Sequence, residues 1–152
     1  MRLQLGFARL SDIPRLAELL GFLFKQESDF KADPRKQAAG LRLILRDPRR
    51  GRIFTARYGG AVIGMVSLLF IISTAEGGPV VWLEDFVLDP AWRGKGIGAK
   101  LLDHAIAYAR RRGIKRITLL TDRTNVRAAR LYLRRGFQSS DMIPLRLALK
   151  KR

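Results

Sequence analysis

The sequence contains no cysteine, and this absence excludes disulfides, thiolate metal sites and a cysteine nucleophile. Long hydrophobic runs are also lacking: the longest, from Ala61 to Ile72, contains Gly64 and Ser67 and is too short to span a bilayer. The N-terminus has no long apolar segment of the kind found in secretory signals. We therefore expect a cytoplasmic protein that does not enter a membrane.

Acidic residues are scarce. Asp and Glu number 13 against 30 Lys and Arg, which gives a formal net charge of +17. Residues 1–92 carry a net charge of +3 and residues 93–152 carry +14. So basic a half indicates a polyanionic partner, either nucleic acid or a phosphorylated cofactor, unless it is a solvated cationic surface. No aromatic-interleaved basic stripe or recognition motif accompanies the charge, so a nucleic-acid or ribosome-associated module is the less favoured alternative.

Repeats, low-complexity segments and linkers are absent as well, and 152 residues is the length of one domain. Gly59-Gly60 is typical of a tight hairpin turn, and Gly113 of a helix end. The order of elements predicts a mixed α/β sheet covered by helices, within a single domain over residues 1–152. In chain order, the predicted elements are a strand over 4–9, a helix from Ser11 as N-cap to about Phe24, a loop over 25–31, a helix from Asp33-Pro34 to Asp47-Pro48, strands over 52–58, 61–71 and 80–88, a helix over 96–112, a strand over 116–121, a helix over 125–135 and a strand over 143–149.

The most informative segment runs from Val80 to Gly98 and places a strand, a glycine-rich turn and a helix start in succession. Backbone N–H groups at a helix start have no internal partner, and glycines let a phosphate approach them closely. Gly94, Gly96 and Gly98 alternate here with cationic and apolar residues, and their spacing fits neither the Walker loop nor the dinucleotide fingerprint. We interpret this turn as a pyrophosphate site, with a plain strand-to-helix turn as the alternative.

The same turn carries a resemblance to a known family. Arg93-Gly-Lys-Gly-Ile-Gly98 matches the R/Q-x-x-G-x-G/A signature of the GNAT acetyltransferase superfamily, and Leu83–Pro90 is similar to that family's fourth strand. Asn125–Phe137 resembles the family segment N-x-x-A-x-x-L-Y-x-x-x-G-F. The resemblance covers nearly the whole chain, and it implies an α/β (α+β) fold with a mixed, largely antiparallel sheet, helices on both faces and splayed central strands. The Leu83–Phe86 run, with the later Leu-Tyr-x-Arg-Arg-Gly, is similar to the polyamine acetyltransferase-like branch.

This resemblance implies an N-acetyltransferase that moves an acetyl group from acetyl-CoA directly to a primary amine of a small molecule or protein. Backbone groups of a bulged, splayed fourth strand would bind the pantetheine arm of the cofactor. Members of the family are often dimers, so we expect a homodimer; a non-catalytic acyl-CoA sensor is an alternative. The residues expected to bind acetyl-CoA are Phe86, Val87, Leu88, Arg93, Gly94, Lys95, Gly96, Ile97, Gly98 and Asn125.

Acetyl transfer to an amine needs a base for the amine and an acid for the leaving thiolate. By the resemblance, Tyr132 is the candidate acid, and packing on the apolar face of its helix is the alternative. Glu84 is the candidate base because a carboxylate within an apolar strand is costly unless it is paired or used. Its neighbour Asp85 is the second choice. We expect the single histidine, His104, to be structural, and no cluster has metal-ligand spacing, so no metal is predicted.

The acceptor amine would lie, by the same resemblance, near the first helix pair and the loops that border the splayed strands. Three acidic residues occur in those segments: Glu27, Asp29 and Glu76. We expect one of them to receive a cationic amine. A polyamine, an aminoglycoside-like amine, an amino acid and a protein terminus all remain open.

Overall fold

The computed structural model describes residues 1–27 and 29–150, and the chain divides into two compact units, Met1–Asp122 and Arg123–Arg152. The second unit contains α4 (Val126–Arg134). The first unit contains β1 (Leu3–Phe7), α1 (Ile13–Gln26), α2 (Pro34–Leu45), β2 (Gly51–Tyr58), β3 (Ala61–Ser73), β4 (Gly78–Leu88), α3 (Ile97–Arg111) and β5 (Ile117–Leu119), with short 3-10 turns at Leu10–Asp12 and Pro90–Trp92.

The described strands form one five-stranded sheet in the order β1-β2-β3-β4-β5. Neighbours from β1 to β4 pair antiparallel, whereas β4 and β5 pair parallel. The parallel ladder joins only Val81–Leu83 to Ile117–Leu119. The rest of β4, from Glu84 to Leu88, therefore separates from β5, and the predicted largely antiparallel sheet with splayed central strands is confirmed.

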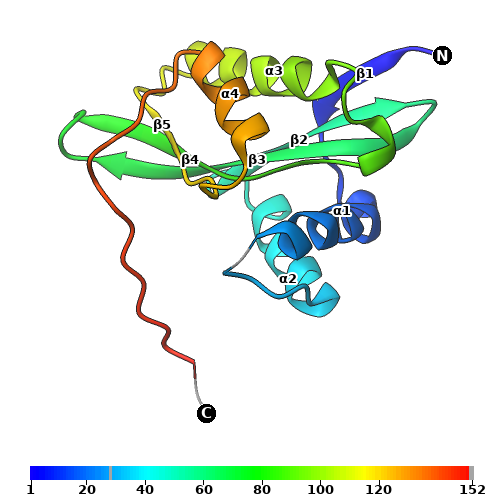
Figure 1. The fold of residues 1–152 in the computed structure, drawn as a ribbon, viewed down its shortest axis with the longest axis horizontal. Coiled ribbons are helices and arrows are strands. Elements are labelled where there is room, and N and C mark those ends of the chain that lie inside the picture. Colours follow the sequence, from blue (N-terminus) through cyan, green and yellow to red (C-terminus); the bar gives the residue numbers. More distant parts are fainter. Residues whose placement is uncertain (28, 151–152) are drawn as a thin grey trace. The chain divides into compact units, whose positions relative to one another are not determined.

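Helices cover both faces of this sheet, as predicted. Figure 1 shows α1 and α2 on one face and α3 on the other. The pleat of β2 explains this division, because successive side chains of a strand point to opposite faces. Ile53 packs in the cluster that contains α1 and α2, while the ring of Phe54 lies 5.1 Å from that of Tyr108 on α3.

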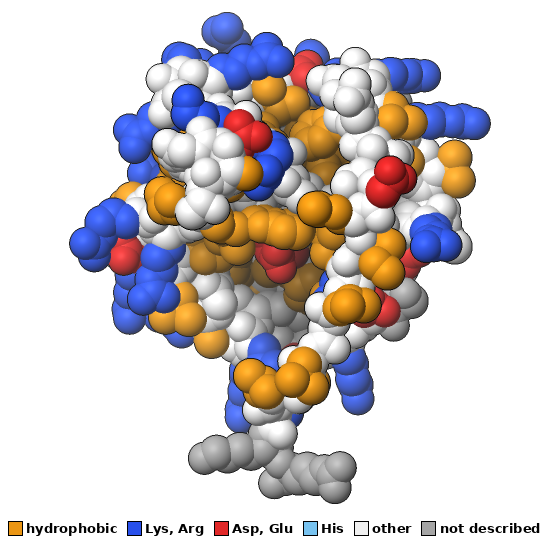
Figure 2. Space-filling model, turned by 90° about the vertical axis from the view of Figure 1, so that its left-hand side faces the viewer, with side chains coloured by type: hydrophobic (Ala, Val, Ile, Leu, Met, Phe, Trp, Pro, Cys, Tyr) orange, Lys and Arg blue, Asp and Glu red, His pale blue; other side chains and the backbone are white. Residues whose placement is uncertain are grey.

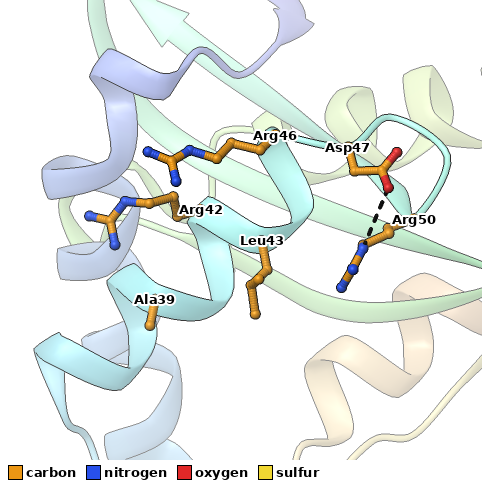
Figure 3. A pocket seen from close by; sticks show the side chains of 6 residues that line it. All are labelled: Ala39, Arg42, Leu43, Arg46, Asp47 and Arg50. Atoms are coloured by element: carbon orange, nitrogen blue, oxygen red, sulfur yellow. Dashed lines mark ion pairs between the residues drawn. The ribbon is translucent and has the colours of Figure 1, made fainter.

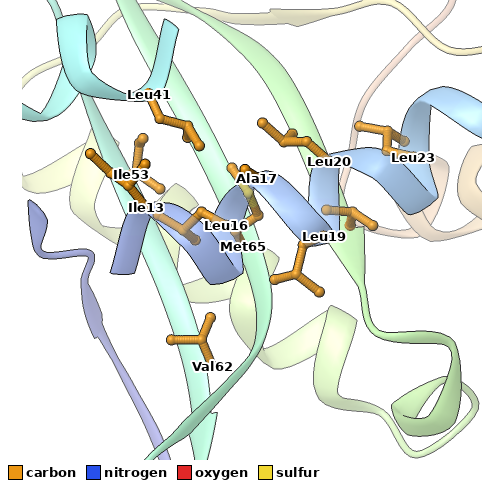
Figure 4. Close-up of a cluster of buried hydrophobic side chains, with 11 residues drawn as sticks. Ile13, Leu16, Ala17, Leu19, Leu20, Leu23, Leu41, Ile53, Val62 and Met65 are labelled. Atoms are coloured by element: carbon orange, nitrogen blue, oxygen red, sulfur yellow. The ribbon is translucent and has the colours of Figure 1, made fainter. Parts of the chain in front are cut away.

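The core beneath α1 follows directly from the periodicity of the sequence. Ile13, Leu16, Ala17 and Leu20 recur at helical spacing, and all four are buried (Figure 4). They pack with side chains from α2 and from strands of the sheet, including Met65. Each large side chain buried in this way contributes about 1.5–3 kcal/mol, so the cluster fixes α1 against the sheet.

The start of α1 differs from the prediction. Ser11 was expected to cap the helix, but a 3-10 turn occupies Leu10–Asp12 and the helix begins at Ile13. Ser11 is exposed, and the Asp12 carboxylate instead accepts the N–H of Arg9 at 2.7 Å. The prediction was wrong because the turn closes one residue later, where Asp12 also pairs with Arg57 of β2.

Predictions that rest on glycine and on a helix cap are confirmed. Gly59 and Gly60 have φ angles of 58° and 83°, the pair of positive values that a type I′ hairpin turn requires. Gly113 follows α3 with a φ of 70°. Asp33 caps α2, because its carboxylate accepts the N–H groups of Arg35 and Lys36. The predicted loop over 25–31 begins two residues later than expected, since α1 reaches Gln26, and it includes Ser28, which lies outside the described residues.

The second unit contains one correction. A final strand was predicted over 143–149, but the structure has no strand there among the residues it describes. A strand needs a neighbouring ladder to satisfy its backbone groups, and the alternating apolar residues of this segment have no such partner. Ile143, Leu145, Leu147 and Leu149 are 72–89% exposed.

Candidate functional site

A β-bulge interrupts the pairing of β3 and β4. Val66 pairs with Phe86 and Leu68 pairs with Leu83, so the single residue Ser67 lies opposite two residues, Glu84 and Asp85. The bulge lies immediately after the last β4 residue that pairs with β5. Bulges of this kind redirect side chains, and this one gives the two carboxylates directions that simple strand alternation does not predict.

Asp85 is held at the bulge by Ser67. The Asp85 N–H donates to Ser67 Oγ at 3.1 Å, and the hydroxyl lies 3.5 Å from the Asp85 carboxylate. Burial, followed by the nearby charges of Glu84 and Glu27, raises the pKa of Asp85 to about 7, while the Ser67 hydrogen bond acts in the opposite direction. Glu84 itself is exposed. The structure thus gives the two neighbouring carboxylates different environments.

Among the described strands, none pairs with the outer edge of β4 over its last residues. Asp89 donates its N–H to Ile63 of β3 at 2.8 Å, and backbone groups of successive residues in a strand face opposite edges. Val87 therefore faces β3, whereas Phe86 and Leu88 face the edge that β5 has left. An extended ligand could add to this edge as a further strand.

The glycine turn lies beside that edge. Gly96 is the N-cap of α3, with a φ of 75°, and a Cβ built on it would meet no atom within 4 Å. A Cβ on Gly98 would lie 3.3 Å from Leu88 and 3.4 Å from Phe86, so this glycine lets α3 pack closely on β4. The first N–H groups of a helix have no intrahelical partner, and helix starts of this kind are able to bind anions such as phosphates.

The two cations of the turn have contacts of their own. Arg93 donates from Nε and Nη2 to the Leu88 carbonyl at 3.2 and 3.1 Å, which ties the turn to the end of β4. Lys95 Nζ lies 4.9 Å from the ring of Trp92, which packs against Tyr58. Arg93 thus braces the turn, and Lys95, which is exposed, adds positive charge beside it.

Sequence reasoning missed a second brace for the turn. The Asp89 carboxylate accepts the N–H of Ala91 at 2.8 Å and pairs with Arg15 Nη2 at 2.5 Å, while Arg15 Nε donates to the Val62 carbonyl. These contacts join α1 to the end of β4, just before the glycines. Arg15 and Asp89 are 74 residues apart, and no spacing rule connects residues so distant.

The remaining predicted residues lie apart from the bulge or in the second unit. Asn125 Oδ1 accepts the Ala128 N–H at 3.2 Å, so Asn125 caps α4. The Tyr132 ring packs 5.6 Å from that of Phe137. His104 packs against Phe54 at 5.6 Å, and burial, followed by the charge of Arg111, lowers its pKa.

The three acceptor candidates do not gather in one place. Glu27, at the end of α1, is close enough to Asp85 for its charge to raise the pKa of that carboxyl. Glu76 lies in the β3–β4 turn, 3.9 Å from Arg116 Nη1. The rise of β4 puts it roughly 20 Å from the bulge. Asp29 is exposed. Glu27 is thus linked to the bulge, whereas Glu76 is remote from it.

Two surface features lie elsewhere. A shallow cavity of roughly 400 Å³ at the end of α2 is lined by Ala39, Arg42, Leu43, Arg46, Asp47 and Arg50, none of them a predicted site residue (Figure 3). On the face in Figure 2, Lys and Arg side chains are spread around the margin rather than gathered into one stripe. Within the described residues, no group of His, Asp and Glu could hold a metal, and no helix is long and apolar enough to cross a membrane.

Comparisons with known proteins agree with this geometry. The family model described as Acetyltransferase (GNAT) family matches residues 6–137. An aminoalkylphosphonate N-acetyltransferase of Salmonella typhimurium is 31% identical over 90% of this chain and 86% of its own length. A spermine/spermidine N(1)-acetyltransferase of Bacillus subtilis is 44% identical over 38% of this chain. Two of the curated relatives extend well beyond their match: the matched stretches span 44% and 39% of their lengths.

A solved structure shows the same fold. The crystal structure of a possible acetyltransferase from Clostridium difficile 630 superposes with a TM-score of 0.87, at 18% identity, over 99% of this chain and all of its own.

Proposed function

Because the chain belongs to the acetyltransferase (GNAT) family, we propose that it is an N-acetyltransferase that moves an acetyl group from acetyl-CoA to a primary amine of a small molecule or protein. One observation carries this proposal: β4 leaves β5 at a bulge, and its open edge leads directly into the glycine turn that begins α3. An extended thioester arm and a pyrophosphate fit these two adjoining features.

Acetyl-CoA would be held by residues of both features. The edge that β5 leaves at Phe86 and Leu88, with Val87 between them, is suited to the pantetheine arm. Because the Leu88 carbonyl accepts from Arg93, its N–H is the Leu88 group proposed to bind this arm. The turn from Arg93 to Gly98, with Gly94, Lys95, Gly96 and Ile97, is suited to the pyrophosphate, because it combines a helix start, whose first N–H groups lack intrahelical partners, with positive charge. Asn125 is proposed to reach the cofactor arm through the amide nitrogen that its cap does not use.

Tyr132 is the proposed acid that protonates the leaving thiolate, and the carboxylates at the bulge, Glu84 with Asp85, are proposed to supply the base. The fall in rate expected on removing such a group is about 10²–10⁴-fold. The proposed acceptor is a small cationic amine, which the negative charge near Asp85 favours. The Bacillus and Salmonella relatives, which are named for spermine/spermidine and for aminoalkylphosphonates, support this class.

We also infer one N-acetyltransferase domain over residues 1–152, because the family match runs across the boundary between the two units. A cytoplasmic location is supported by the lack of cysteine. A homodimer is supported by the exposed, alternating apolar residues at 143–149, which a second copy of the chain would cover. Light scattering on a size-exclusion column tests it: a dimer should become a monomer in the variant Leu145→Asp/Leu147→Asp, and a monomeric native protein would contradict it.

The proposed function is tested by measuring how much CoA raises the Tm of the native protein and of two variants. Each variant replaces one of the two glycines that flank α3, Gly96 or Gly113, with alanine. Gly96 and Gly113 have φ angles of 75° and 70°, and a Cβ on either would meet no atom within 4 Å. Each alanine variant should lose about 1–2 kcal/mol through its left-handed backbone alone. CoA should raise the Tm of the native protein and of Gly113→Ala, but much less that of Gly96→Ala, because a Cβ there lies in the path of the phosphate.

Thiol release from acetyl-CoA with a panel of amines, including spermidine and 2-aminoethylphosphonate, then identifies the acceptor. Turnover of one amine class supports the proposal. Absence of both CoA-dependent stabilisation and thiol release with every amine would overturn it.

A further inference from the structure

The end of α2 and the start of β2 carry the densest positive charge within residues 1–92. Residues 42–52 hold five arginines and one aspartate, a net charge of +4, although residues 1–92 as a whole carry only +3. All of the arginines except the last are exposed. We call this set the α2 arginine cluster, and its members are Arg42, Arg46, Arg49, Arg50 and Arg52.

One carboxylate serves this cluster. Asp47 Oδ1 lies 3.0 Å from Arg49 Nε, and its Oδ2 lies 3.6 Å from Arg50 Nε. Among residues 1–27 and 29–150, no carboxylate pairs with Arg42 or Arg46. These two arginines are four positions apart on α2, and Figure 3 shows their guanidinium groups extending in the same direction. Like charges at this spacing repel each other, so an incoming anion would relieve both.

The shallow cavity at the end of α2 gives the cluster a shape. Arg42, Arg46 and Arg50 line it together with Ala39 and Leu43. The Leu43 side chain is 58% exposed, so an apolar surface lies among the charges. A hollow of roughly 400 Å³ receives a protruding side chain, whereas a flat lipid surface would span it.

The neighbouring aromatic residue does not favour nucleic acid. Arg52 Cζ lies 3.7 Å from the centre of the Phe7 ring and covers one of its faces. The rings of Phe54 and Tyr108 lie 5.3 and 5.7 Å from that of Phe7. Single strands are bound by stacking bases on aromatic rings, and phosphates make no use of an exposed leucine. A second copy of this chain would bring a further net charge of +17 and would be repelled.

We propose that the α2 arginine cluster is a docking surface for an acidic segment of another protein. In this complex, carboxylates of the segment pair with Arg42 and Arg46, and an apolar side chain between them packs on Leu43 in the cavity. Arginine suits such a surface, because its planar guanidinium binds a carboxylate through two N–H groups and interfaces are enriched in it. The cluster contains none of the residues proposed to bind acetyl-CoA or to transfer protons, so docking is separable from acetyl transfer.

Fluorescence anisotropy tests this inference with a labelled peptide of Asp-Leu-Glu repeats as the probe. A peptide of Asp-Gly-Glu repeats has the same charge and should bind the native protein about fivefold more weakly, because it lacks the apolar contact. Arg42→Glu/Arg46→Glu should weaken binding of the leucine peptide about tenfold. Leu43→Ser should abolish the preference for the leucine peptide over the glycine peptide.

The matched control is Arg110→Glu/Arg111→Glu, which makes the same change of charge at the end of α3, where both arginines are exposed. Each double variant removes cations from a helix C-terminus, so the two Tm values should fall alike. The control should weaken binding by less than about threefold. Equal weakening by the two double variants would show that the peptide responds to net charge alone and would overturn the inference.

A second measurement needs no variant. Adding the leucine peptide to the native protein labelled with nitrogen-15 should shift the amide NMR signals of residues 39–50 and leave those of residues 108–112 unchanged. Shifts confined to other segments, equal binding of the two peptides, or tighter binding of an oligothymidylate or of phosphatidylserine vesicles at physiological ionic strength would overturn the inference. Arg42→Glu/Arg46→Glu should keep native acetyl transfer, so the proposed function is tested separately.

Discussion

Asp12 and Asp85 belong to the same unit and the same residue type, yet their surroundings differ. The Asp12 side chain is 10% exposed and pairs with Arg57, whose side chain is 17% exposed. Burial alone would raise the pKa of Asp12, but the hydrogen bonds from Arg57 and the Arg9 N–H, together with the charges of both arginines, lower it. At Asp85, the same burial is reinforced by two acids, and its pKa rises to about 7.

The difference shows that a cationic partner reverses the effect of burial at Asp12, whereas at Asp85 burial and the neighbouring acids act in the same direction. Asp12 with its arginine joins the start of α1 to β2 and has a structural role. Asp85 has no comparable structural role, because its ionisation near neutral pH destabilises the fold. A destabilising group at an open edge of the sheet is typical of a functional site.

The largest expected effect comes from removing the cation of the first pair. Arg57→Met should destabilise the protein by about 3 kcal/mol at pH 7, because it leaves the Asp12 charge buried and uncompensated. Urea unfolding measures this loss. Arg49→Met is the control. The Arg49 side chain is 91% exposed and pairs with Asp47 at the surface, so its removal should leave the urea midpoint unchanged. Equal losses of stability in the two variants would contradict the claim that the Arg57–Asp12 pair stabilises the fold more than the exposed Arg49–Asp47 pair.

Removing the second carboxylate should have the opposite sign. Because the folded pKa of Asp85 lies above its unfolded value near 3.8, the native state binds more protons between about pH 4 and pH 7, and stability falls over that range as pH rises. Ionisation of Asp85 in the folded state costs about 4 kcal/mol of stability at pH 8. Burying an asparagine amide in its place costs about 2 kcal/mol.

Asp85→Asn should therefore be about 2 kcal/mol more stable than the native protein at pH 8, with no gain at pH 4. Urea unfolding at the two pH values measures the difference. A gain that is the same at both pH values would show that Asp85 does not titrate in this range.

Much of the fold was predictable, because it depends on short-range patterns such as the apolar spacing of α1, the Gly59-Gly60 turn and the glycines before α3. The acidic residues at the bulge were named, but their different environments were not, since a bulge changes strand alternation and depends on the pairing of β3 with β4. The ion pairs of Arg57 and Arg15 join residues 45 and 74 positions apart, beyond any local rule. The prediction of a final strand over 143–149 was wrong because alternation of apolar residues does not show whether a neighbouring strand is present to pair with.

The smallest expected effect concerns Asp12 itself. Its folded pKa is lowered, so the stability it contributes is present above its unfolded value near 3.8 and is lost as pH falls through the folded value. Asp12→Asn should cost about 1 kcal/mol at pH 7, since the amide oxygen of the same shape is still able to accept a hydrogen bond from Arg57, and almost nothing at pH 2. Thermal unfolding across this range measures it, and a loss independent of pH would assign the effect to packing.

The spatial order of the strands also has a consequence for how the chain reaches its native state. β2, β3 and β4 are consecutive in the sequence and joined by two tight hairpins, so their ladders form with little loop-closure entropy. β5 must wait for the crossover through α3, and its ladder spans three residues. The central meander should therefore gain protection from hydrogen exchange early in refolding, and the edge that faces the glycine turn should be the last part to become rigid.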